Sequence, residues 1–154
     1  MTIEDDIAFF EKVPTLGLLG RGALRILAIG VESRYVHGGE VLFRVGDQAD
    51  SGFVVQEGSF SLTTSAADNG RQITVGPGTL LGELALLTET KRPATATALE
   101  PSTVLRIPRP LFMKMLEGYP DAAQRLREIL AKRIEESARD IQSVRTAFDA
   151  HQRK

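Results

Sequence analysis

The chain has 154 residues, 42% of them hydrophobic and 25% charged, which is the composition of a folded globular protein and excludes a disordered or collagen-like one. It contains no cysteine and two histidines, which excludes disulfide frameworks and thiolate chemistry and leaves few members for a catalytic triad. Its 19 basic and 20 acidic residues give a formal net charge of −1, so a nucleic acid would meet no overall positive field, and no apolar run approaches the roughly 20 residues that cross a membrane.

The first 32 residues carry apolar side chains at helical spacing, for example Ile7 and Phe10 and then Leu24 and Leu27. Pro14 and several glycines interrupt this pattern. The segment therefore predicts two short helices joined by a turn.

From residue 33 to 108 the pattern changes to short runs of strand formers separated by glycine-containing turns. Examples are 53–55 and 60–63, and Asp68-Asn69-Gly70 is typical of a hairpin loop. An antiparallel sandwich, roll or barrel is expected. Within it, Leu81 to Leu87 is rich in leucine and alanine and predicts a short helix.

After Pro108 the spacing of apolar residues is again helical, with a break at Gly118-Tyr119-Pro120. Residues 121–149 predict one long amphipathic helix. Its apolar stripe consists of Leu126, Leu130, Ile134, Ala138, Ile141, Val144 and Phe148. We expect a single domain over 1–154, with C-terminal helices over 109–154.

The segment that indicates chemistry runs from Gly76 to Ala98. A glycine-rich turn leads into the expected short helix, whose backbone N–H groups favour an anion. Arg92 follows Glu83 by nine residues; its guanidinium suits a phosphate, and the carboxylate could accept hydrogen bonds from a sugar. Two alternatives are a structural ion pair between these residues and a dinucleotide fingerprint, but no βαβ pattern surrounds the glycines.

Residues Leu81-Gly82-Glu83-Leu84-Ala85-Leu86, followed by Arg92-Pro93-Ala94-Thr95, resemble the phosphate-binding cassette of cyclic nucleotide-binding domains. The spacing between the glutamate and the arginine is that of the family. Two further runs, 39–47 and 53–58, resemble the family's G-E-x-I-F-x-x-G-D and Y-x-V-x-x-G strands. The resemblance extends over residues 7–145.

This resemblance implies a mainly β member of the α+β class, an eight-stranded antiparallel β-roll over 33–108 between N-terminal helices (1–32) and C-terminal ones. The cassette (residues 78–95) would bind the ligand. By position, Glu83 would hold the ribose 2′-hydroxyl and Arg92 the cyclic phosphate. The remaining ligand-binding candidates are Gly82, Leu84 and Ala85, through their backbone groups, with Pro93 and Ala94 beside the arginine.

Two positions depart from the family pattern. Leu81 replaces the usual phenylalanine, a change that affects packing. Pro93 has neither a backbone N–H for the phosphate nor the hydroxyl that meets guanine in many cGMP-preferring domains. We therefore expect weakened or altered binding, with cAMP favoured over cGMP.

Bacterial members of the family are often transcription factors with a further DNA-binding domain, and this chain stops at Lys154. We expect a cytoplasmic sensor module that signals through its C-terminal helix to a protein partner or a second copy. No catalytic residue, metal, further cofactor, nucleic acid or membrane partner is expected. The alternative is a protein-interaction module that has lost nucleotide binding, which Pro93 favours and the presence of Glu83 and Arg92 disfavours.

Overall fold

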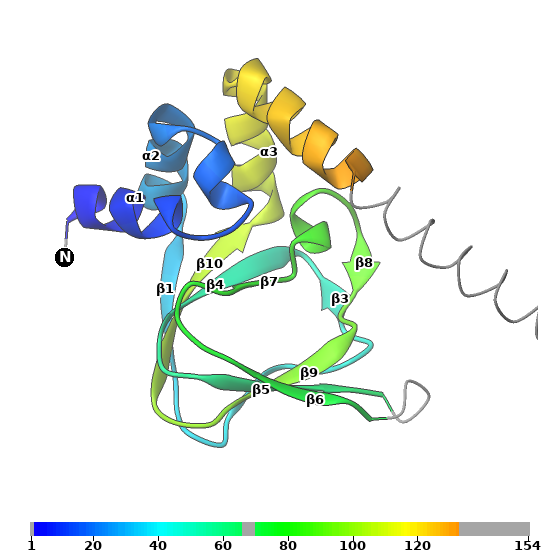
Figure 1. Cartoon of the computed structure of the whole chain (residues 1–154). Helices are drawn as coiled ribbons and strands as arrows, with labels where there is room; N and C mark the ends of the chain where they lie inside the picture. The colour runs from blue at the N-terminus through cyan, green and yellow to red at the C-terminus, as the bar shows by residue number, and fades with distance from the viewer. Residues whose placement is uncertain (1, 66–69, 133–154) are drawn as a thin grey trace, which may run out of the picture.

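The computed structural model describes residues 2–65 and 70–132, and Figure 1 shows helices packed at one end of a roll of strands. The helical elements are α1 (Ile3–Glu11), the 3₁₀ helix η1 (Leu16–Leu18), α2 (Arg21–Gly30), the 3₁₀ helix η3 (Leu84–Leu86) and α3 (Arg109–Gly118). A further helical stretch runs from 120 to 132, the last described residue. The strands are β1 (Glu32–Val36), β2 (Val41–Phe43), β3 (Gln48–Ala49), β4 (Ser51–Glu57), β5 (Phe60–Thr64), β6 (Gln72–Val75), β7 (Leu80–Leu81), β8 (Thr90–Lys91), β9 (Ala94–Ala98) and β10 (Ser102–Pro108).

The N-terminal helices form where the sequence predicts them. A capping box begins α1: the Asp5 N–H donates to Thr2 Oγ1 at 3.2 Å, and the Thr2 N–H donates to the Asp5 carboxylate at 3.1 Å. Pro14 and Gly17 lie between α1 and α2, where η1 adds a single 3₁₀ turn. The prediction of two short helices joined by a turn is confirmed.

The strands pair antiparallel throughout the described chain, in two four-stranded sheets. Sheet A has the order β1-β10-β4-β7, sheet B has the order β2-β9-β5-β6, and β3 pairs with β8. The predicted α+β roll with flanking helices is confirmed. It is divided into more strands than the eight expected, because β3, β7 and β8 are segments of only two residues.

Two hydrophobic cores follow from the alternation of side chains along the strands. The inner core lies between the sheets and includes Phe53, Val55 and Val104. The outer core lies between sheet A and the helices and includes Val54 and Leu105. Strand β4 therefore contributes to both cores.

The short helix expected over 81–87 is wrong in extent. Leu80 and Leu81 form β7, which pairs with β4, and Gly82 follows with φ +81°, outside the helical region. Only the 3₁₀ turn Leu84–Leu86 remains. The strand pairing and the left-handed glycine override the helical propensity of this leucine-rich run.

The long C-terminal helix predicted over 121–149 starts one residue earlier, and its described part ends at 132. Leu126 is buried and Leu130 is partly buried against the outer core, as the stripe requires. The other stripe positions, Ile134, Ala138, Ile141, Val144 and Phe148, lie outside the described residues, as do Asp68 and Asn69 of the hairpin loop. No helix in the described part of the chain is long and apolar enough to span a membrane.

Candidate ligand site

A cavity of about 270 Å³ lies against the cassette, and we call it the cassette cavity. Its lining includes six of the seven residues singled out from the sequence: Gly82, Glu83, Leu84, Ala85, Arg92 and Pro93. Ala49, Thr90 and Lys91 complete it. Ala94 is buried in β9, next to Pro93, but does not line the cavity.

Because Gly82 has no side chain, the Arg92 guanidinium can lie against the backbone of the cassette. With φ +81°, Gly82 adopts a backbone conformation that side chains disfavour. A Cβ atom at this position would collide with Nη1 of Arg92. The guanidinium therefore packs directly on the glycine backbone, at the start of the cassette turn.

The Arg92 side chain is 4% exposed and stacks on aromatic rings of the roll. Its guanidinium carbon lies 4.4 Å from the ring centre of Phe43 and 5.4 Å from that of Phe53. Nη2 donates to Ser51 Oγ at 3.4 Å. Nη1 is buried and has no hydrogen-bond partner among the described residues.

Burial lowers the pKa of Arg92 from its ordinary value, and the charge of Asp50 acts in the opposite direction. Asp50 is connected to the arginine through Ser51, whose hydroxyl donates to Oδ1 of Asp50 at 3.0 Å. Arg106 also donates to Asp50, at 3.3 Å, and to Glu32, at 2.9 Å. A buried cation is thus linked to a surface network of carboxylates.

The carboxylate of Glu83 points to a different partner. Its Oε2 atom accepts a hydrogen bond from Thr15 Oγ1 at 3.0 Å, across 68 positions of sequence. Glu83 is half-buried, and Thr15 is 4% exposed. Glu83 and Arg92 therefore line one cavity while each is fixed by its own neighbours.

The cassette turn is held by its own backbone and by Arg109, the first residue of α3. The Ala85 N–H donates to the Gly82 carbonyl at 3.1 Å, so this N–H is already engaged within the turn. Arg109 Nε donates to the Ala85 carbonyl at 2.7 Å, and its Nη2 donates to the Ala49 carbonyl. The start of α3 is thereby connected to two walls of the cassette cavity.

The Arg92 backbone is fixed by the turn that ends β2. Its N–H donates to the Asp47 carbonyl at 2.8 Å, and its carbonyl accepts from the Gly46 N–H at 2.8 Å. The next residue, Pro93, is exposed and lines the cassette cavity. The position next to the arginine therefore presents a ring without a donor to the cavity.

A second cavity, of about 250 Å³, meets the first at Arg92, which lines both. Its other walls are Arg34, Leu42, Phe43, Asp47, Gln48, Asp50, Ser51, Phe53 and Arg106. Most of these side chains are polar or charged. Arg92 thus lines both the cassette cavity and a mostly polar cavity.

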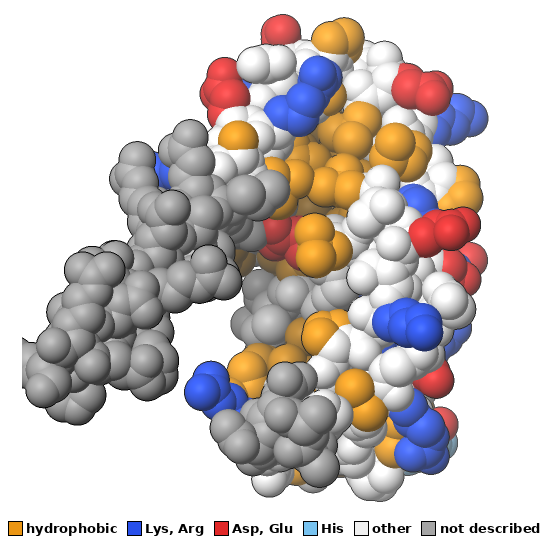
Figure 2. All heavy atoms as spheres, turned by 90° about the vertical axis from the view of Figure 1, so that its right-hand side faces the viewer, with side chains coloured by type: hydrophobic (Ala, Val, Ile, Leu, Met, Phe, Trp, Pro, Cys, Tyr) orange, Lys and Arg blue, Asp and Glu red, His pale blue; other side chains and the backbone are white. Residues whose placement is uncertain are grey.

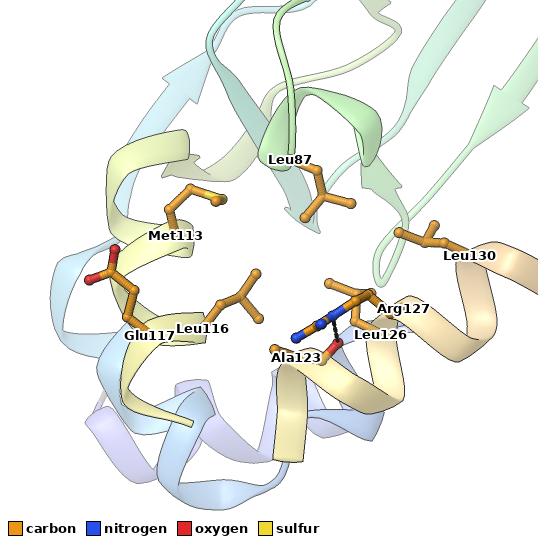
Figure 3. A pocket seen from close by; sticks show the side chains of 8 residues that line it. All are labelled: Leu87, Met113, Leu116, Glu117, Ala123, Leu126, Arg127 and Leu130. Carbon is orange, nitrogen blue, oxygen red and sulfur yellow. Dashed lines mark hydrogen bonds between the residues drawn. The ribbon is translucent and has the colours of Figure 1, made fainter. Parts of the chain in front are cut away.

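The largest of the three cavities, about 410 Å³, lies away from these charged groups, and we call it the apolar cavity. Figure 3 shows Leu87 of the cassette, Leu116 of α3 and Leu126 of the 120–132 helix pointing into the space between these elements. Arg127 Nε donates to the Ala123 carbonyl at 3.4 Å. Six of the eight residues that line this cavity are apolar, and Glu117 and Arg127 are the two charged ones. Because Glu83 and Arg92 both line the cassette cavity, we assign the candidate site to that cavity.

Hydrophobic side chains gather in the upper, helical half of the face shown in Figure 2. Leu84 and Met113 are exposed large hydrophobic residues, with exposed fractions of 59% and 40%. The first lines the cassette cavity and the second the apolar cavity. Both cavities therefore border on exposed apolar surface.

Several residues of the site were not singled out from the sequence as site residues. Phe43 and Phe53 stand within the runs that carry the family resemblance, but nothing in those runs places their rings on Arg92. Ser51 and Arg109 act through hydrogen bonds across 41 and 24 positions. Spacing in sequence carries no signal for such contacts.

A protein-family model described as "Cyclic nucleotide-binding domain" matches residues 33–119. A solved structure of a cyclic nucleotide-binding-like protein from Brucella abortus is 37% identical, with a TM-score of 0.64, covering 73% of this chain and 98% of that one. A cyclic nucleotide-gated potassium channel of Mesorhizobium japonicum is 30% identical over 121 residues, which are 79% of this chain and 33% of the channel. Lysophospholipase NTE1 of Chaetomium globosum is 31% identical over 101 residues, or 64% of this chain and 7% of that protein.

Proposed function

Because the chain belongs to the cyclic nucleotide-binding domain family, we propose that it is a sensor module that binds a 3′,5′-cyclic nucleotide in the cassette cavity, with cAMP preferred to cGMP. The fold is typical of regulatory, non-enzymatic domains. The observation that carries the proposal is that Glu83 and Arg92 line one cavity and that Nη1 of Arg92 is buried without a hydrogen-bond partner in the described chain.

The buried guanidinium favours an anionic ligand. A buried donor without a partner costs roughly 1–3 kcal/mol, and more when it is charged. A cyclic phosphate carries one negative charge on two oxygens outside the ring, which suits the paired N–H groups of Arg92. Such a ligand would turn an unfavourable burial into a charge-assisted hydrogen bond.

The glutamate favours a ligand with a sugar. In the proposed complex, the Glu83 carboxylate accepts a hydrogen bond from the ribose 2′-hydroxyl while Arg92 binds the phosphate. The two side chains line the same cavity, as recognition of one small sugar phosphate requires. A 2′-deoxy analogue should therefore bind more weakly than cAMP.

Pro93 supports the preference for cAMP. It lines the cavity and supplies neither a hydroxyl nor an N–H, so guanine gains no donor from this position. The same absence removes one possible donor to the phosphate. We expect binding weaker than that of a domain with a donor there.

The proposed output runs through the C-terminal helix, predicted over 121–149, to a protein partner or a second copy of the chain. The 120–132 segment contacts the N-terminal elements, because Arg125 Nη1 donates to the Leu18 carbonyl at 2.9 Å. It also lines the apolar cavity together with Leu87 of the cassette. A ligand that shifts the cassette would change this packing, since it can act only through contacts that differ between the two states.

Hydrogen exchange tests this output. We expect protection across 121–149 to differ by more than threefold with and without cAMP, whereas β5 and β6 of sheet B change less. Equal protection in both states would refute the helix as the output element. A monomer in sedimentation with cAMP bound would leave only a separate protein as the partner.

The direct test of the function is calorimetric titration of ligand-stripped protein with cAMP and cGMP, with 5′-AMP as the control that lacks the cyclic phosphate. We expect heat with cAMP, less affinity for cGMP and no comparable signal with 5′-AMP. Absence of heat and of a thermal shift at millimolar cAMP would overturn the proposal.

That negative result would favour a protein-interaction module without a ligand. The packing of Arg92 on Phe43 and Phe53 is the observation that supports the interaction-module alternative, because it gives the arginine a structural role that needs no phosphate. Arg92→Met would then change the packing of the roll but leave the binding of a protein partner unchanged. Under the sensor proposal the same substitution strongly weakens nucleotide binding.

A further inference from the structure

The turn between α1 and η1 has an unusual backbone at Thr15. Its φ of +77° makes it the one residue other than glycine with positive φ in the described chain. With ψ −52°, Thr15 lies near the strained γ-turn region, which a β-branched side chain disfavours. Such strain persists only where the surrounding structure fixes it, and it concentrates at functional sites.

The turn is fixed by the outer core on both sides of Thr15. Val13 and Leu16 are 1% and 0% exposed, and both belong to the core cluster that contains Leu86 of the cassette. The Gly17 N–H donates to the Val13 carbonyl at 2.9 Å and closes the turn around Thr15. The strained residue is therefore anchored in the same core as the cassette turn.

The strained backbone aims the Thr15 hydroxyl at the cassette. Oγ1 donates to Glu83 Oε2 at 3.0 Å, and Thr15 itself does not line the cassette cavity. A carboxylate has two oxygens and about four acceptor positions, so this bond is compatible with a second one to a sugar hydroxyl. The hydrogen bond limits the rotamers of the half-buried Glu83 before any ligand arrives.

We propose that Thr15 is a positioning residue for sugar recognition: its hydroxyl holds the Glu83 carboxylate in the orientation that accepts the ribose 2′-hydroxyl. This inference rests on the proposed nucleotide binding. It places part of the selectivity for ribose over deoxyribose in the N-terminal helices, outside the cavity. Loss of the Thr15 hydroxyl then weakens binding only for ligands that carry a 2′-hydroxyl.

The test is a set of dissociation constants for cAMP and 2′-deoxy-cAMP, measured by calorimetry on the full chain. Thr15→Val removes the hydroxyl and keeps the branched shape, and Thr15→Ser keeps the hydroxyl. We expect Thr15→Val to lower the affinity for cAMP about 3- to 10-fold and to change the affinity for 2′-deoxy-cAMP less than twofold. Thr15→Ser should bind both ligands with the affinity of the parent protein. In a Glu83→Gln background, Thr15→Val should raise the dissociation constant for cAMP by less than a further twofold.

Two further variants keep the test decisive. Thr15→Gly also lacks the hydroxyl but accepts positive φ, so it should show the same selective loss even if Thr15→Val folds poorly. Thr103→Val, on strand β10, controls for an ordinary threonine-to-valine change and should bind both ligands like the parent.

Each remaining outcome overturns the inference. Equal losses for both ligands in Thr15→Val and Thr15→Gly would mean that Thr15 only supports the cassette structure. Unchanged affinity for cAMP in both would mean that Glu83 needs no such support. If the parent protein binds neither nucleotide, the proposed function fails, and the role of Thr15 fails with it.

Discussion

Leu84 and Ala85 line the cassette cavity, and Leu87, in the same short segment, lines the apolar cavity. The first cavity has about 270 Å³ and contains a buried arginine and a half-buried glutamate. The second has about 410 Å³, and most of its lining is leucine, methionine and alanine. Volume alone would select the second cavity, whereas the converging polar groups select the first as the ligand site.

The comparison predicts that substitutions in the two cavities have opposite signatures. Arg92→Ala should weaken cAMP binding by about 2–5 kcal/mol, because the phosphate loses its buried counter-charge. Calorimetric titration measures the loss, and Arg71→Ala, at an exposed arginine, is the control that should bind normally. Unchanged affinity for cAMP in Arg92→Ala would place the ligand outside the cassette cavity, and the polar groups of that cavity would then no longer identify it as the ligand site.

Leu126→Ala probes the apolar cavity. Leu126 is 4% exposed and belongs to the outer core, so its truncation should lower the free energy of unfolding by about 2–3 kcal/mol, near the low end for buried leucines. Denaturant unfolding measures it. A loss of cAMP affinity as large as that of Arg92→Ala would contradict the assignment of the ligand to the cassette cavity.

Gly82→Ala separates backbone strain from steric collision at the cassette. Gly78 also has positive φ (+89°), but a Cβ atom there would meet nothing within 4 Å, whereas a Cβ atom at Gly82 collides with Arg92. Gly78→Ala should therefore destabilise by about 1 kcal/mol and Gly82→Ala by about 2 kcal/mol or more. Equal unfolding free energies for the two variants would show that Arg92 can move away without loss.

Pro93→Ala should strengthen cAMP binding by about tenfold, or about 1.4 kcal/mol, because it restores an N–H beside Arg92. Pro93→Thr should raise the affinity for cGMP relative to cAMP. The dissociation constants for cAMP and cGMP, and their ratio, measured in each variant, test both expectations. If both affinities and their ratio stay as in the parent, the missing donor has no influence on the ligand.

Asp50→Asn should have the smallest effect, on the pH dependence of stability. Burial raises the pKa of Asp50, but the hydrogen bond from Ser51 and the charge of Arg106 outweigh it, so the net pKa is lowered. The carboxylate therefore stabilises the fold above its unfolded pKa of about 3.9, and this contribution is lost as the pH falls through the lower folded value.

Because the Asp50 side chain is 74% exposed, the loss in Asp50→Asn at pH 7 should stay below about 1 kcal/mol and vanish near pH 2. Unfolding free energies between pH 7 and pH 2 measure this, with Glu89→Gln, at another exposed acid, as the control. A constant difference over this range would exclude titration of Asp50 as its cause.

The sequence predicts the antiparallel roll because glycine turns divide runs of strand formers, and the helices follow from apolar spacing. It fails at Leu81–Leu87, where pairing with β4 and the left-handed Gly82 replace most of the helix. Local propensity cannot anticipate a strand partner that lies almost 30 positions earlier.

The residues that line the candidate site were predictable as a group, since Glu83 and Arg92 stand in one motif and line one cavity. The residues that contact Glu83 and Arg92 were not predictable from the sequence. Thr15 reaches Glu83 across 68 positions, and the ring of Phe43 contacts Arg92 from β2, a strand that pairs with β9. Such contacts depend on how the sheets and helices pack, which no spacing rule encodes.

Strand β4 (Ser51–Glu57) has a consequence for how the molecule opens. Five successive residues, 51–55, are buried, with Val54 in the outer core and Phe53 and Val55 in the inner one. Neither core can come apart without exposing one side of this strand. The inner and the outer core should therefore unfold together as one cooperative unit. The slowest-exchanging amides of β4 should then report the global free energy of unfolding.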